Sequence, residues 1–202
     1  MATTITTNEM LSNVAKTVGE KYGFERATAE FVAFADFKVR WTRSYKYVDF
    51  TVSDYLKGAD EGVLEDLFDI VIRKFKGLDG EYSERFKGHI TAPAFSETHR
   101  PTYLGRKRAE KENSTTFHGI PVFFSKRTDS PVAEVASTLM RSIIINSRLK
   151  DAPQEVQDAV IAHGYNVIQN GLPSFGLEGQ EVECNTAVAN DWLVRNGMQG
   201  IY

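Results

Sequence analysis

The chain contains a single cysteine, Cys184, among its 202 residues. It can therefore form no disulfide within itself, and a metal cluster built from several cysteines is excluded. No window approaches the roughly 18 to 20 apolar residues that a membrane-spanning helix needs. The start, MATTITTNEM, has neither the basic nor the apolar region of a secretory signal. These absences predict a cytoplasmic protein with no membrane partner.

Several motifs that mark catalysis or nucleotide binding are also missing. The sequence has no glycine-rich phosphate loop, no G-x-S-x-G nucleophile elbow and no C-x-x-C pair. Cys184 stands between Glu183 and Asn185 in a segment, 177–197, that we expect to be helical. Because nearby carboxylates raise the pKa of a thiol, this setting favours a buried thiol over a nucleophile.

The composition is that of an ordinary soluble globular protein. Hydrophobic residues make up 42% of the chain and charged residues 25%, and the net charge of -3 gives no general attraction to nucleic acid or to anionic membranes. The length suits a single domain over 1–202. We expect a helical N-terminal part at about 1–36 and a core of sheet and helices at about 37–197.

Changes of hydrophobic period divide the N-terminal half into elements. Helical spacing predicts helices over 8–22, 25–36 and 60–76, the last with a wide apolar stripe. Alternation of Val48, Phe50 and Val52 with polar residues predicts a half-buried strand, for which 37–41 is a plausible partner strand.

The most informative stretch runs from 140 to 170. The apolar run Ile143–Ile145 is followed by helix-starting residues, with Asp151 as the expected N-cap and Pro153 in the first turn. Val156, Val160, His163 and Val167 then follow one another at spacings of four, three and four residues, which is one face of a helix. His163 is therefore predicted on the inward, apolar face.

This stretch resembles the SprT-like and YgjP-like zincin metallopeptidases. The resemblance rests on the strand at Ile143–Ile145, the turn with Arg148-Leu149 and Ala152-Pro153, and the helix with VIAH, where the family reads AHELxH. It implies an α+β, zincin-like fold: a small mixed sheet packed with helices, including a central helix at the former active-site position.

The catalytic residues of that family are largely replaced here. His163 matches the first histidine of the motif, but Gly164 stands in place of the general-base glutamate and Val167 in place of the second histidine. A catalytic zinc takes three protein ligands and leaves one position open, so one imidazole cannot hold it alone. The resemblance therefore implies a catalytically inactive relative, with no cofactor expected, that serves as a binding or regulatory module.

Two other interpretations of His163 remain open. A rearranged zinc site would make the protein a metal-dependent hydrolase or peptidase, with His163 joined by Glu181 or Glu183 if their segment is a helix packed alongside. Alternatively, His163 is a core histidine that is hydrogen-bonded to a neighbour, such as one of these glutamates. The zinc content of the protein separates the two interpretations.

Two surfaces are candidates for partners. The segment 117–126 has strand character, and Pro121 favours an edge position, so Val122, Phe123 and Phe124 are expected to offer an edge that binds a protein or peptide. Basic and aromatic residues at 40–47, with the charge run 106–111, suggest nucleic-acid binding as a further alternative. A charge run such as 106–111 is more often a solvated helix end or loop. Arginines beside aromatic residues, as at 40–47, more often pack their stems on the rings.

Overall fold

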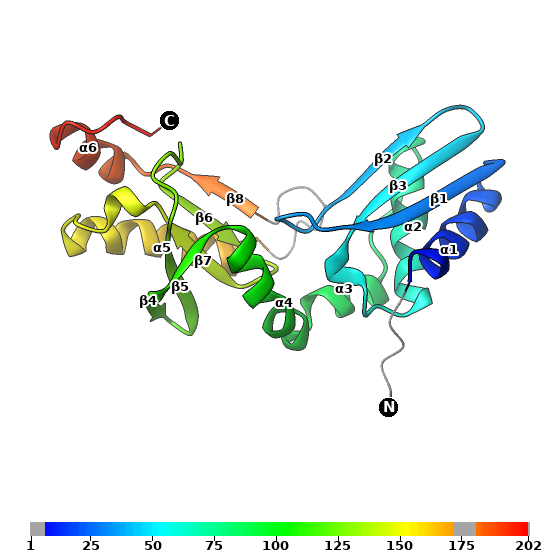
Figure 1. The fold of residues 1–202 in the computed structure, drawn as a ribbon, viewed down its shortest axis with the longest axis horizontal. Helices are drawn as coiled ribbons and strands as arrows, with labels where there is room; N and C mark the ends of the chain where they lie inside the picture. The colour runs from blue at the N-terminus through cyan, green and yellow to red at the C-terminus, as the bar shows by residue number, and fades with distance from the viewer. Residues whose placement is uncertain (1–6, 172–180, 202) are drawn as a thin grey trace. The chain divides into compact units, whose positions relative to one another are not determined.

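The structure, a computed structural model, describes residues 7–171 and 181–201. The chain forms two compact units, Met1–Phe95 and Ser96–Tyr202, where the sequence suggested one domain. Each unit combines helices with a mixed β-sheet, so the predicted α+β class is confirmed (Figure 1).

Unit 1 is a three-stranded sheet covered by helices on one face. Its strands lie in the order β1-β3-β2, with β1 parallel and β2 antiparallel to β3. Val48, Phe50 and Val52 of β3 are buried, as their alternation predicts. The elements are α1 (Asn8–Lys21), β1 (Arg26–Val32), β2 (Val39–Arg43), β3 (Tyr47–Ser53), the 3-10 helix η1 (Asp54–Leu56), α2 (Glu61–Phe75) and α3 (Glu84–Thr91).

Local capping fixes where the helices of unit 1 begin. Thr7, Asp60 and Ser83 each accept a hydrogen bond from a backbone N–H in the first turn of α1, α2 and α3, respectively. The predicted helices at 8–22 and 60–76 are confirmed. The helix expected over 25–36 is wrong, because β1 occupies this segment and buries Ala27 and Ala29 alternately against the core.

Unit 2 contains a five-stranded sheet in the order β4-β5-β7-β6-β8. β5 and β7 are parallel, and the other neighbouring pairs are antiparallel. A core of apolar residues from the sheet, α5 and α6 fills the space between them. The elements are α4 (Pro93–Arg106), β4 (Ala109–Phe117), β5 (Ile120–Ser125), β6 (Glu134–Ser137), β7 (Ser142–Ile145), η2 (Ser147–Leu149), α5 (Gln154–Asn170), β8 (Glu181–Cys184) and α6 (Ala187–Arg195).

The structure corrects three expectations in unit 2. β5, with Val122, Phe123 and Phe124, pairs with β4 on one side and β7 on the other, so it offers no free edge. The helix expected over 177–197 is wrong where it is described, because 181–184 forms β8 and α6 starts at Ala187; residues 177–180 lie outside the described part. The predicted helix with His163 is confirmed, although its N-cap is Pro153 rather than Asp151.

The two units repeat one succession of elements. In each, a first strand pairs in parallel with a third, a second strand pairs antiparallel with the third, and a 3-10 turn and a long helix follow. Thus β1, β2, β3, η1 and α2 correspond to β5, β6, β7, η2 and α5. In both units the helix begins seven residues after the start of the 3-10 turn, from Asp54 to Glu61 and from Ser147 to Gln154.

The repeat extends to single residues. From the third strand through the helix, a residue of unit 1 corresponds to the residue 93 positions later, as Asp54 corresponds to Ser147. Leu56, Ala59 and Val63 are matched by Leu149, Ala152 and Val156, and all six are buried. The same three apolar side chains therefore fix the turn and the first helical turn in both units.

Candidate functional site

A carboxylate, an imidazole and a thiol meet on one face of the sheet of unit 2. His163 of α5 lies between Glu134 of β6 and Cys184 of β8. The distance from His163 Nδ1 to Glu134 Oε1 is 2.7 Å, and the distance from His163 Nε2 to Cys184 Sγ is 3.3 Å. Both contacts are satisfied by the tautomer in which Nδ1–H donates to the carboxylate and Nε2 accepts the thiol proton.

Strand pairing brings two of these residues together. Glu134 lies directly opposite Cys184 in the antiparallel pair of β6 and β8, and directly opposite residues point to the same side of a sheet. Ala136, two residues along β6, belongs to the core that α5 covers. Glu134 and Cys184 therefore both face α5, where the helix presents His163.

Glu134 is an unusual residue for such a position. Its side chain has no solvent exposure, and its second oxygen, Oε2, has no hydrogen-bond partner in the described part of the chain. Burial raises the pKa of Glu134 from 4.5 to about 7, and the hydrogen bond from His163 limits this rise. A buried carboxylate with one unsatisfied oxygen is costly for folding, which makes it a functional candidate.

The other two groups are more accessible. The side chain of His163 is 38% exposed, and Cys184 is partly buried. Burial and the nearby Glu134 carboxylate raise the pKa of the Cys184 thiol. The thiol therefore rests as S–H, and a small molecule from solvent can approach the imidazole.

The glutamates that the sequence suggested as partners of His163 point elsewhere. In strand β8, Glu181 and Glu183 alternate with Cys184, so they face the side of the sheet away from α5. Glu181 forms an ion pair with Lys107, with 2.5 Å between Nζ and Oε2. The expectation that Glu181 or Glu183 faces His163 is therefore wrong. A glutamate does contact His163, as the core-histidine interpretation proposed, but it is Glu134.

Gly164 and Val167, which replace two residues of the zincin motif, both lie against other parts of unit 2. Val167 packs against the core of unit 2. A Cβ atom built on Gly164 would lie 3.1 Å from Glu134 Oε1 and 3.2 Å from Oε2. Gly164 thus occupies the point of α5 that the Glu134 carboxylate touches.

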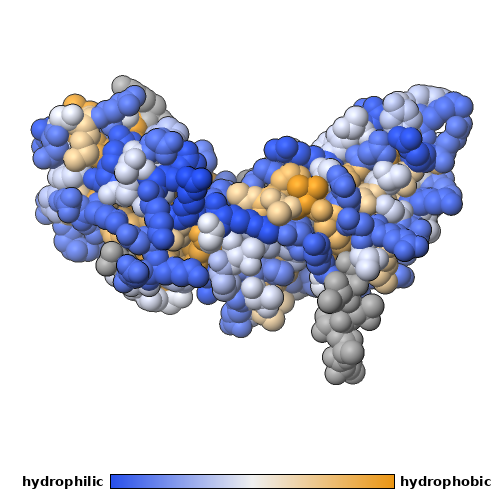
Figure 2. Space-filling model, viewed as in Figure 1, coloured by the Kyte–Doolittle hydropathy of each residue, from blue (hydrophilic) through white to orange (hydrophobic). Residues whose placement is uncertain are grey.

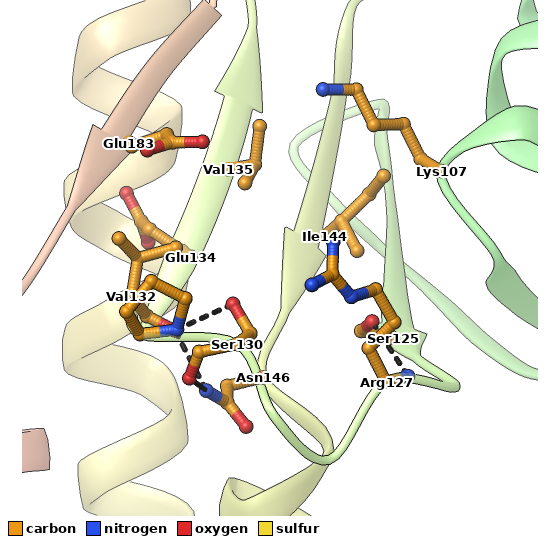
Figure 3. Close-up of a pocket in the computed structure, with 11 residues that line it drawn as sticks. Lys107, Ser125, Arg127, Ser130, Val132, Glu134, Val135, Ile144, Asn146 and Glu183 are labelled. Atoms are coloured by element: carbon orange, nitrogen blue, oxygen red, sulfur yellow. Dashed lines mark hydrogen bonds between the residues drawn. The ribbon is translucent and has the colours of Figure 1, made fainter. Parts of the chain in front are cut away.

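A small pocket of about 100 Å³ lies next to Glu134, mainly on the other side of the sheet (Figure 3). Its two basic groups are already engaged: Lys107 pairs with Glu181, and Arg127 pairs with Asp129. Its wall includes Lys107, Arg127, Val135, Ile144, Asn146 and Glu183. Val135 and Ile144 point away from α5, so the pocket opens on the face opposite the Cys184 thiol.

The basic and aromatic residues at 40–47 mostly contact rings, or an arginine, that lie outside the segment. Arg43 lies 4.9 Å from the Phe75 ring, and Arg26 lies 4.7 Å from the Tyr47 ring. Tyr45, in the β2–β3 turn, is 95% exposed. Hydrophilic side chains make up most of the face in Figure 2. These stacked arginines match the packing interpretation of the segment, and nucleic-acid binding stays a prediction.

Comparison of the chain with protein-family models, with curated proteins and with solved structures finds no match. The resemblance to SprT-like and YgjP-like zincins therefore stays a prediction. No helix within residues 7–171 and 181–201 is long and apolar enough to cross a membrane.

The raised pKa of Glu134 predicts how the stability of unit 2 depends on pH. The folded-state pKa of about 7 lies above the ordinary 4.5, so the contribution of Glu134 to the free energy of unfolding is complete below pH 4.5, where its carboxyl group is protonated in both states. This contribution is lost as the pH rises through 7, by about 3 kcal/mol in the free energy of unfolding. Urea unfolding at pH 5 and pH 8 measures it, and a Glu134→Gln variant with the same pH dependence would contradict the assignment.

Proposed function

We propose that the protein is a thiol-dependent hydrolase that cleaves an acyl bond, with Cys184 as nucleophile, His163 as general base and Glu134 as the group that orients the base. The observation that carries the proposal is the bridging imidazole, with the thiol 3.3 Å from Nε2 and the carboxylate 2.7 Å from Nδ1. A nucleophile within reach of a base that a third group holds is the general signature of such sites.

The proposed reaction has two steps. His163 Nε2 takes the thiol proton as the sulfur attacks the substrate carbonyl carbon; the S–C bond forms, the bond to the leaving group breaks, and the imidazolium returns its proton to the leaving group. Water, deprotonated by the same nitrogen, then attacks the thioester, releases the acid and regenerates the thiol. Throughout, Glu134 accepts the Nδ1–H hydrogen bond and stabilises the imidazolium.

The electrostatics favour a concerted proton transfer. Many reactive cysteines rest as thiolates beside a cation or a helix N-terminus. Here burial and Glu134 raise the pKa of Cys184, so the proton leaves the sulfur only when His163 accepts it during attack. Glu134 assists fully once it is ionised, so activity should rise with pH through about 7.

The proposal differs from an inactive zincin-like binding module. Gly164 and Val167 remove the zincin general base and second metal ligand, but they leave the thiol and the imidazole untouched. The frame that resembles a zincin would then serve a different chemistry. A catalytic thiol has to stay reduced, so we place the protein in a reducing compartment such as the cytoplasm.

The experiment uses an activated ester, p-nitrophenyl acetate, as a general acyl donor. We expect a burst of p-nitrophenol, an acetyl group on the peptide that contains Cys184 by mass spectrometry, and slow release of that group. The Cys184→Ser variant should show no acetylated thiol at this position. Acetylation that is equally fast in the Cys184→Ser or His163→Ala variant, or that is never hydrolysed, would reject the proposal.

A second candidate function is binding of a zinc-type metal ion at His163, with Cys184 in place of the Glu181 or Glu183 that the sequence suggested as ligands. Bonds of about 2.3 Å to sulfur and 2.0 to 2.1 Å to nitrogen place the two ligand atoms about 3.5 Å apart on a tetrahedral zinc, close to the observed 3.3 Å. The 2.7 Å separation of Nδ1 and Oε1 is too short for both atoms to bind one ion, so Glu134 would orient the histidine from outside. Stoichiometric zinc in the purified protein, lost in His163→Ala, would favour this function.

A further inference from the structure

The repeat of the two units provides a natural comparison for the site. Val39 pairs with Val52 in unit 1, as Glu134 pairs with Ile145 in unit 2. Ile145 is the residue 93 positions after Val52, so Val39 is the structural counterpart of Glu134. The correspondence within the helices gives Ile70 as the counterpart of His163.

The counterparts in unit 1 are apolar and buried. Val39 is 7% exposed and Ile70 2% exposed. Next to Ile70, the counterpart of Gly164 is Val71, also 2% exposed. Unit 1 thus packs three apolar side chains where unit 2 has a carboxylate, an imidazole and a glycine.

The comparison explains why a glycine stands inside α5. A glycine in a helix interior costs about 1 kcal/mol relative to alanine, and Gly164 has no positive φ that would require one. Unit 1 accepts a valine at this position, so the shared frame does not require glycine either. A Cβ of residue 164 would stand 3.1 and 3.2 Å from the two Glu134 oxygens and 3.2 Å from Ile143 Cδ1. Of these neighbours, the carboxylate is the one whose counterpart in unit 1, Val39, is apolar.

We infer that the two units are tandem copies of one β–β–β–3-10–α unit, and that Gly164 is a positioning residue by which the second copy admits the Glu134 carboxylate beside His163. The inference rests on the proposed function for its catalytic meaning. Gly164 touches no reacting atom; it acts through Glu134, which in turn holds the imidazole. A Cβ at 164 would require the Glu134 carboxylate to shift by a few tenths of an ångström, and we infer that this shift disturbs its hydrogen bond with His163 Nδ1.

The test is the Gly164→Ala variant of the full chain. The hydrogen-bonded Nδ1 proton of His163, observed by proton–nitrogen NMR, should disappear or shift, and acetylation of Cys184 by p-nitrophenyl acetate should slow at least tenfold because the base is misplaced. Adding Glu134→Asp, which shortens the carboxylate side chain by one methylene, should restore part of both signals. A merely structural role for Gly164 would not produce this rescue.

Gly105→Ala is the matched control, because Gly105 lies in helix α4 with open space around its would-be Cβ. It should leave the NMR signal and the acetylation rate unchanged. An unaltered Nδ1 proton in Gly164→Ala, or no rescue by Glu134→Asp, would overturn the inference. If the NMR signal is lost and restored as expected while no form of the protein becomes acetylated, the positioning role stands and the hydrolase proposal fails.

Discussion

Replacing Glu134 by glutamine is expected to slow acetylation of Cys184 about 100-fold or more, because the carboxylate that orients the general base His163 is lost. Glutamine has nearly the shape of glutamate and can still accept the Nδ1–H hydrogen bond. It lacks the negative charge that stabilises the imidazolium formed when His163 takes the thiol proton. Stopped-flow measurement of the p-nitrophenol burst at pH 8 gives the rate.

The same variant is expected to be more stable than the parent at pH 8, because the cost of burying an ionised carboxylate is removed. A slower rate in a more stable protein cannot be explained by unfolding. Glu183→Gln is the matched control, since Glu183 neighbours Cys184 in β8 but lies on the opposite face of the sheet. Equal slowing by both substitutions, or no slowing by Glu134→Gln, would contradict the role of Glu134.

Local signals in the sequence were sufficient for helices α1, α2 and α5 and for one residue of the site, but α3 and α4 were not predicted. The apolar spacing around His163 predicted both the helix and its inward face, and Asp60 marked the start of α2. These features depend on residues three or four apart, which the sequence displays directly. The strand β1 was mistaken for a helix because Phe31, Val32 and Ala35 fit a helical face, whereas the alternation that buries Ala27 and Ala29 was overlooked.

The partners of His163 could not be predicted in the same way. Glu134 and Cys184 lie 29 and 21 residues from His163, and their proximity depends on the register between β6 and β8. A shift of this register by one residue would turn the thiol to the other face and bring Glu183 toward α5. The helix expected over 177–197 was a further obstacle, because it favoured Glu181 or Glu183 as the partner of the imidazole and missed the strand pairing of Cys184.

One signal in the sequence pointed toward the site. The strand–turn–helix pattern at 48–77 recurs at 141–170, and comparison of the two copies isolates the positions where an apolar residue is exchanged for a polar one or a glycine. His163 and Gly164 are among these positions, opposite Ile70 and Val71, together with others such as Gln157, opposite Leu64. To find Glu134 one also needs the strand pairing, because the residues of β2 and β6 do not follow the offset of 93 that holds for the rest of the repeat.

The comparison of the two units also predicts how much the polar residues of the site destabilise unit 2. A triple variant, Glu134→Val with His163→Ile and Gly164→Val, gives unit 2 the apolar contacts of unit 1. Replacing buried charged groups by apolar ones stabilises by about 1 to 4 kcal/mol, and removing a helix glycine adds up to about 1 kcal/mol. We expect unit 2 to unfold about 10 °C higher or more, with no acetylation above that of free thiol.

The reverse triple variant of unit 1, Val39→Glu with Ile70→His and Val71→Gly, is the control, and it should destabilise unit 1 while leaving α5 unaffected. Hydrogen exchange of the α2 and α5 amides measures each unit separately within the full chain. A triple variant of unit 2 that is less stable than the parent would mean that the two units do not share their packing at these positions. Greater stability together with lost reactivity would instead show that the buried carboxylate and the glycine are maintained for the chemistry of Cys184, because the fold is better off without them.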